Sequence, residues 1–183
     1  MKRMLTIILA LIGSCAWADT ETVNGYIWTY KIKGDSAELY NLGSAAISPS
    51  PIGEVIIPST LGGKQITSVG KYAFYNCTNL TSVTIPDSVT SIGDHAFSYC
   101  SRLCSMTISG GVTNIGDNAF YRCNSLESFN VSVRNQNYCS KNGLLLSKDG
   151  RNIMFGVNGD VIIPDSIERI RDGAFAGCGG IKR

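Results

Sequence analysis

The sequence repeats itself every 23 residues, and this period constrains the fold more than any other feature. Three segments align without gaps: ITSVGKYAFYNCTNLTSVTIPDS from Ile66, VTSIGDHAFSYCSRLCSMTISGG from Val89 and VTNIGDNAFYRCNSLESFNVSVR from Val112. A fourth segment, IERIRDGAFAGCGGIKR, begins at Ile167 and is incomplete. A unit of this length cannot bury its own apolar face, so the units must stack on one another.

One part of each unit has the pattern L-x-x-V-x-I, as in Leu80, Val83 and Ile85. Alternation of apolar and polar residues is typical of a strand with one buried face. Equivalent strands of stacked units should pair in parallel, about 4.8 Å apart. The polar residues between them would form an uncharged outer face, expected on the concave side and predicted as a binding surface: Ser82, Thr84, Ser105, Thr107, Ser128 and Asn130.

The other part of each unit, I-G-D-x-A-F-x-x-C, predicts a short helical turn. Gly93 and Gly116 allow the backbone to bend, Asp94 is placed to cap the turn, and Phe97 and Cys100 point into the core. Stacking would turn the repeated positions into ladders of aromatic rings and buried free thiols: Phe74, Phe97, Phe120 and Phe175, and Cys77, Cys100, Cys123 and Cys178. Tyrosines close behind the phenylalanine either form a second contact stripe or pack between units: Tyr75, Tyr99 and Tyr121.

Asp94, His95 and Cys100 lie within seven residues and suggest a nucleophilic or metal site at first sight. The position of His95 holds Tyr72 and Asn118 in other units, whereas a cysteine recurs in every unit, which indicates a structural role for Cys100. The chain has one histidine and no C-x-x-C pair, so we expect no metal site. We predict no catalytic residues, no cofactor and no enzymatic activity.

Two cysteines, Cys104 and Cys139, lie outside the repeated position, and a disulfide between them is possible. Bridges within the cysteine ladder are disfavoured, because stacked side chains point the same way.

Residues 1–18 are predicted to be a signal peptide. Lys2 and Arg3 precede an apolar segment, and Ala16–Ala18 form an A-x-A cleavage site. An alternative is a lipobox ending at Cys15, which would then carry a lipid anchor. Either route makes the protein secreted or attached to the cell surface. The apolar segment is too short for a membrane span, and no other segment could form one.

Residues 19–54 are predicted to form a capping β segment, and residues 55–183 the repeat array. An insert at about 132–160 interrupts the period, and within it Asp149–Gly150 separates two apolar runs. This pattern predicts a β-hairpin that projects from the stack. The charge is nearly balanced, with 16 Lys and Arg against 14 Asp and Glu, so no nucleic-acid partner is expected.

The phrases VTSIGDHAFSYCSRL followed by MTI, and LTSVTIPDSVTSIG, resemble the BspA-type leucine-rich repeats. The resemblance covers about Val55 to Arg183, and the segment from Val23 resembles one often found ahead of such arrays. It implies a right-handed, β-rich solenoid that binds other proteins, matrix components or glycans outside the cell, as an adhesin-like module does.

Two other functions are compatible with the repeats. The array could be a structural spacer or a truncated fragment that binds nothing. Stacked threonines on the strand face could also bind ice or a crystal surface, although Cys104, Glu127 and Asn130 interrupt that regularity.

Overall fold

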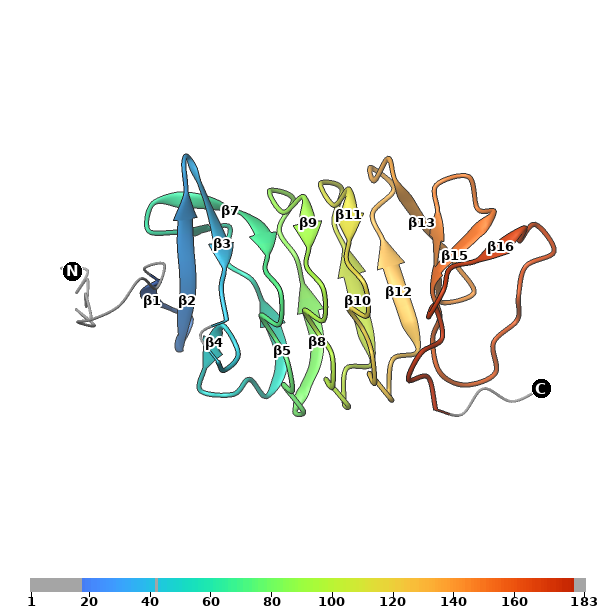
Figure 1. The fold of residues 1–183 in the computed structure, drawn as a ribbon, viewed down its shortest axis with the longest axis horizontal. Helices are drawn as coiled ribbons and strands as arrows, with labels where there is room; N and C mark the ends of the chain where they lie inside the picture. Colours follow the sequence, from blue (N-terminus) through green and yellow to red (C-terminus); the bar gives the residue numbers. More distant parts are fainter. Residues whose placement is uncertain (1–17, 42, 180–183) are drawn as a thin grey trace.

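The computed structural model describes residues 18–41 and 43–179, which form strands and turns (Figure 1). Among these residues, nothing forms a helix long and apolar enough to cross a membrane. Residues 1–17 of the predicted signal peptide, including the candidate lipid-anchor residue Cys15, lie outside the described residues.

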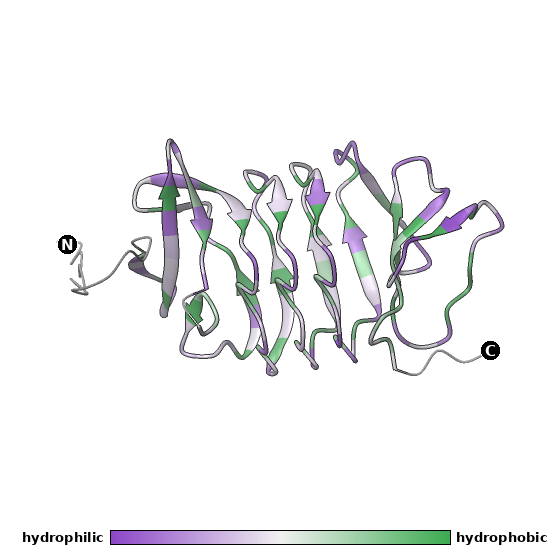
Figure 2. Ribbon diagram, viewed as in Figure 1, coloured by the Kyte–Doolittle hydropathy of each residue, from purple (hydrophilic) through white to green (hydrophobic). Residues whose placement is uncertain are grey.

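The L-x-x-V-x-I segments form a parallel sheet in which equivalent residues of successive units face each other. Ser105 is paired with Ser82 on one side and with Ser128 on the other. Met106, the residue after Ser105 in the same strand, is buried. Hydrophobic and hydrophilic residues thus alternate along the strands (Figure 2). The sheet has the order β12-β10-β8-β5, with the bounds β5 Gly53–Ile56, β8 Leu80–Thr84, β10 Ser105–Ile108 and β12 Ser128–Val131.

A second sheet contains the strands of the N-terminal segment and the strands that come just before the repeated turns. Its N-terminal strands are antiparallel. The strand β3 (Ser36–Leu39) then pairs in parallel with β7 (Lys64–Val69), and the sheet continues through β9 (Ser91–Ile92) to β11 (Asn114–Ile115). Trp28 contacts Phe74 of the first unit at a ring-centroid distance of 6.2 Å. The strands are β1 Asp19–Val23, β2 Tyr26–Lys33, β3 Ser36–Leu39, β4 Ile47–Ser48, β6 Thr60–Leu61, β7 Lys64–Val69, β9 Ser91–Ile92 and β11 Asn114–Ile115.

The short helical turns predicted for I-G-D-x-A-F-x-x-C are absent from the described residues. Tyr72 and Asn76 have φ values of 60° and 59°, which interrupt any helical backbone. The N–H groups of Tyr72 and Phe74 donate instead to carbonyls of the next unit, at 3.2 and 2.7 Å. The prediction was wrong because stacking offers these N–H groups acceptors that an isolated turn lacks.

Asp94 and Gly93 therefore act differently from the prediction. Asp94 Oδ1 accepts a hydrogen bond from the backbone N–H of Asp117 in the next unit, at 3.0 Å, and caps no helix. Gly93 does not have a positive φ; a Cβ on it would lie 2.7 Å from the backbone nitrogen of Lys71. The repeated glycine is needed because neighbouring units approach too closely for any side chain.

The insert contains the expected hairpin, but this hairpin packs into the stack and does not project from it. Leu144, Leu145 and Leu146 are buried, and the Phe129 N–H donates to the Gly143 carbonyl at 2.9 Å. The apolar runs flanking the turn thus continue the core. The insert adds β13 Tyr138–Lys141, β14 Leu144–Ser147 and β15 Asn152–Phe155, and β15 pairs in parallel with β16 Arg169–Ile170.

Candidate binding surfaces

The repeated phenylalanines form a stacked column in the core. The Phe74 and Phe97 rings are 4.9 Å apart with 13° between their planes, and Phe97 and Phe120 are 5.7 Å apart with 5°. Phe175 does not extend this column. Phe155 of the insert contacts Phe120 edge-on at 5.2 Å, because the insert separates the third unit from the last.

The repeated cysteines lie beside this column as free thiols. Cys100 Sγ donates to the Phe74 carbonyl and Cys123 Sγ to the Phe97 carbonyl, each at 3.1 Å. Burial raises the pKa of the Cys123 thiol to about 12. A hydrogen bond with Cys77, together with burial, also raises the pKa of Cys100. All four are free: Cys77, Cys100 and Cys123 are buried, and Cys178 is half-buried.

The disulfide that the sequence left open is not formed, since Cys104 and Cys139 are both free. Cys104 is exposed, and its thiol donates to the Arg102 carbonyl. Cys139 is half-buried and donates to the Ser147 carbonyl at 3.2 Å.

His95 contacts Ser98, a pair that could suggest a nucleophile and its base. The distance from His95 Nδ1 to Ser98 Oγ is 3.1 Å, but Ser98 is fully buried and its hydroxyl donates to the Asn118 carbonyl. The His95 ring stacks on Tyr72 at 5.1 Å. These contacts join successive units. Within the described residues, no three His, Cys, Asp or Glu side chains gather as a metal site would require.

The outer face of the β5-β8-β10-β12 sheet carries the predicted polar residues in two rows. One row is Glu54, Ser82, Ser105 and Ser128, and the other is Ile56, Thr84, Thr107 and Asn130. Glu54 and Ile56 were missed by the sequence interpretation, although the alternation around Val55 indicates them. Together these eight residues are the strand face, and Thr107 and Asn130 are its exposed members on β10 and β12.

The predicted tyrosine stripe is part of a larger aromatic surface. Tyr75, Tyr99 and Tyr121 contact one another in turn, at centroid distances of 5.3 and 5.7 Å. The Arg122 guanidinium lies 5.5 Å from the Tyr99 ring and 5.6 Å from the Tyr121 ring. Tyr72 and His95, whose rings stack on each other, extend this set through the contact of Tyr72 with Tyr75. Together these residues are named the tyrosine ridge: Tyr72, Tyr75, His95, Tyr99, Tyr121 and Arg122.

Four residues of the tyrosine ridge have a left-handed backbone. The φ values are 60° at Tyr72, 53° at His95, 65° at Tyr99 and 57° at Arg122. The last unit places Gly173 and Gly177 at the corresponding positions. A bulky residue in this region carries a backbone cost of order 1 kcal/mol, and such strain is common at functional sites.

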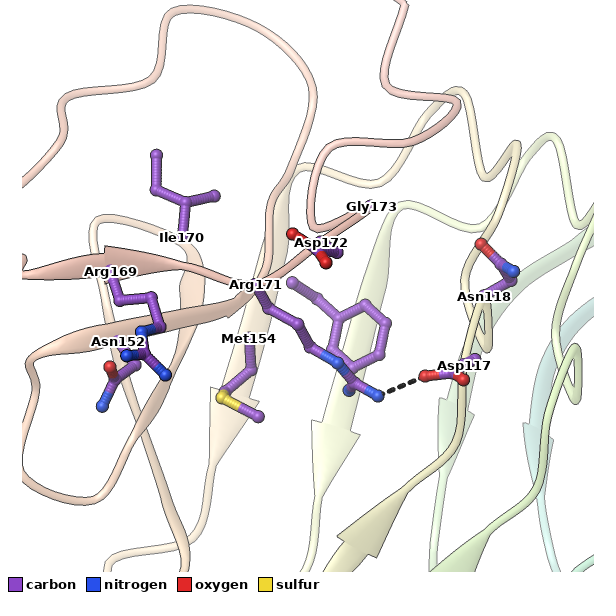
Figure 3. Close-up of a pocket in the computed structure, with 10 residues that line it drawn as sticks. Asp117, Asn118, Asn152, Met154, Arg169, Ile170, Arg171, Asp172 and Gly173 are labelled. Carbon is purple, nitrogen blue, oxygen red and sulfur yellow. Dashed lines mark hydrogen bonds and ion pairs between the residues drawn. The ribbon is translucent and has the colours of Figure 1, made fainter.

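A pocket of about 1050 Å³ opens where the third unit meets the insert and the last unit (Figure 3). Asp117 and Asn118 form one wall, and side chains of β15, β16 and the segment after β16 form the other. Arg171 spans the pocket and bonds to Asp117. No sequence pattern predicts this pocket, because it depends on how the insert packs.

Parallel pairing of equivalent strands, with the L-x-x-V-x-I residues buried, is the arrangement expected of a leucine-rich repeat protein. Residues 41–143, more than half of the chain, match six copies of the BspA type leucine rich repeat region. The chain therefore belongs to the BspA-type leucine-rich repeat family.

Solved structures of other leucine-rich repeat proteins are similar to this chain. One from Bacteroides capillosus has a TM-score of 0.52 and 24% identity, over 90% of this chain and 95% of that one. One from Eubacterium ventriosum has a TM-score of 0.41 and 20% identity, over 86% of this chain; the chain spans 56% of that relative. A leucine rich cell surface protein from Faecalibacterium prausnitzii has a TM-score of 0.30 and 17% identity, over 88% and 69%. None of the curated proteins compared matches the sequence.

Proposed function

We propose that this chain is an exported, adhesin-like repeat protein that binds a partner protein outside the cell through the tyrosine ridge. The observation that carries the proposal is the unbroken series of contacts from Tyr72 through Tyr75 and Tyr99 to Tyr121, with Arg122 against the last two rings.

The composition of the tyrosine ridge supports a protein partner. Tyrosine and arginine are the residue types enriched in the energetic centres of protein interfaces. The rings already contact one another, so little side-chain freedom is lost on binding. Left-handed φ values at Tyr72 and Tyr99, where Asn or Gly would fit with less strain, suggest that aromatic rings serve a purpose other than stability.

The strand face is a weaker candidate. Its two rows offer hydroxyl and amide groups without an aromatic anchor, and Glu54 and Ile56 break the regularity that ice binding would require. It serves as the matched control surface.

The tyrosine ridge is tested with Tyr99→Asn. We expect the variant to lose at least about tenfold in affinity for a partner found in a panel of purified matrix proteins, because an interface anchor is typically worth more than about 1.4 kcal/mol. Its stability should stay within about 1 kcal/mol of the wild type, since Asn tolerates the left-handed backbone. Surface plasmon resonance and urea denaturation measure the two effects.

The control is Thr107→Ala, an exposed substitution on the strand face, which should leave the affinity unchanged. Weaker binding by Thr107→Ala with normal binding by Tyr99→Asn would assign the interface to the strand face. A chain that binds no member of the panel would favour the spacer function.

A further inference from the structure

The pocket beside β16, here named the corner pocket, exists because the regular pairing of units stops there. The second sheet ends at β11, and β16 pairs with β15 of the insert. The corner between them is open (Figure 3), and none of its lining residues belongs to the tyrosine ridge or the strand face. A ligand in this corner would therefore be separate from the partner proposed above.

Arg171 gives the corner pocket a fixed wall. Its Nη1 donates to the Ile115 carbonyl at 3.3 Å and its Nη2 to Asp117 Oδ1 at 2.5 Å. The guanidinium also lies 5.3 Å from the centre of the Phe155 ring. In earlier units, a backbone N–H of the next unit donates to the carbonyl equivalent to Ile115, as Gly116 does to Ile92. Arg171 replaces that donor, so its position is set by the fold before any ligand binds.

Arg169 and Asp172 also line the corner pocket, but their charges have no partner there. Among the described residues, Arg169 forms no ion pair with a carboxylate, and Asp172 forms none with a cation. Both are exposed. The pocket therefore offers a guanidinium and a carboxylate to a ligand. Figure 3 shows Arg169 beside Asn152, and Asp172 on the other side of Arg171, in the direction of Asn118.

This set of groups matches a sugar that carries a carboxylate. Each sugar hydroxyl is both a donor and an acceptor, and amide and carboxylate side chains satisfy both roles. A guanidinium binds a carboxylate through two parallel hydrogen bonds. Met154, which lies beside Arg171 in Figure 3, adds apolar contact for the face of a sugar ring. The volume of about 1050 Å³ is at the upper end for ligand pockets.

We propose that the corner pocket binds a short oligosaccharide of uronic acid type. Arg169 receives the carboxylate, while Asp172, Asn118 and Asn152 bind ring hydroxyls. Inorganic phosphate could bind Arg169, but it has no ring hydroxyls for Asn118 and Asn152 and no apolar ring face for Met154. A neutral sugar would leave Arg169 without a partner.

The test is isothermal titration calorimetry of the folded chain with trigalacturonate, maltotriose and inorganic phosphate. We expect trigalacturonate to bind at least tenfold more tightly than either of the other two. Arg169→Gln should weaken trigalacturonate binding at least tenfold, whereas Arg151→Gln, which removes an exposed arginine paired with Glu168, should not. Phosphate that competes equally, or equal binding by Arg169→Gln and the wild type, would overturn the proposal.

Asp172→Ala separates hydroxyl recognition from simple charge attraction. Loss of a negative charge alone would strengthen the binding of an anion, but loss of a hydroxyl partner should weaken trigalacturonate binding severalfold. Stronger binding would overturn the assigned role of Asp172 and, with it, the proposal that the ligand is a sugar. Tyr99→Asn should leave trigalacturonate binding unchanged, so failure of the corner pocket and failure of the tyrosine ridge are distinguishable. Circular dichroism confirms that each variant is folded.

Discussion

At the scale of single residues, the repeated cysteine has two roles in one buried position. Its side chain fills space beside the phenylalanine column, and its thiol donates to the carbonyl of the phenylalanine in the preceding unit, as Cys100 does to Phe74. Serine could supply the hydrogen bond but would place a more polar group in the core, and alanine would supply neither. This explains why a cysteine persists here without forming a disulfide.

Cys100→Ala should lower the free energy of unfolding by about 1–3 kcal/mol, because it removes a buried atom and leaves a small cavity. Cys104→Ala is the matched control, since Cys104 is exposed. The control should change stability by less than about 0.5 kcal/mol. Urea denaturation measures both, and equal effects would contradict the structural role of Cys100.

The buried thiols also predict a dependence of stability on pH. The pKa of Cys123 rises from 9.0 to about 12 on folding, so the folded chain holds a proton that the unfolded chain releases between these values. The stabilisation is complete below about pH 9 and falls by about 1.4 kcal/mol per pH unit above it. Urea midpoints at pH 8 to 11 should fall less steeply for Cys123→Ser. Equal slopes of the urea midpoint against pH for the wild type and Cys123→Ser would show that Cys123 does not contribute to the pH dependence.

At the scale of the structural element, successive turns can stack closely only where a glycine leaves room for the backbone of the neighbouring unit. A Cβ on Gly116 would lie 2.5 Å from both the backbone nitrogen and Oδ1 of Asp94. The buried side chain of Asn135 links the insert to the preceding units through hydrogen bonds to backbone groups. It donates to the carbonyls of Ser109 and Val112 and accepts from the N–H groups of Asn137 and Tyr138, so all its hydrogen bonds are made.

Gly116→Ala should destabilise the fold by about 1–3 kcal/mol, since neighbouring units would have to separate to accept the methyl group. Gly179→Ala is the control, because a Cβ there would meet no atom within 4 Å. Urea denaturation should show little change for the control. If Gly116→Ala left the free energy of unfolding unchanged, the units would be less tightly stacked than the structure shows.

At the scale of the whole molecule, most contacts join neighbouring units, and the chain should therefore open from its ends. The middle strands β8 and β10 have paired strands on both sides, whereas β1 and β16 each pair with one strand. Hydrogen exchange should be slowest at Met106 and its neighbours and fastest in β1 and β16. Equal protection along the chain would show that the molecule opens as one unit.

The repeat, the L-x-x-V-x-I strands and the residues that these strands bury follow from the amino-acid sequence alone, whereas the short strands β9 and β11 were not predicted. A period of 23 residues with alternating apolar positions allows only a stack of units, so Val83, Met106 and Phe129 had to share one buried face. The tertiary structure alone decided the conformation of the turns, the packing of the insert and the corner pocket. The N–H groups of Tyr72 and Phe74 donate to carbonyls of the next unit, and these acceptors exist only when the units are stacked. The place of Arg171 likewise follows from how the insert packs, because its partners Ile115 and Asp117 are more than 50 residues away in the chain.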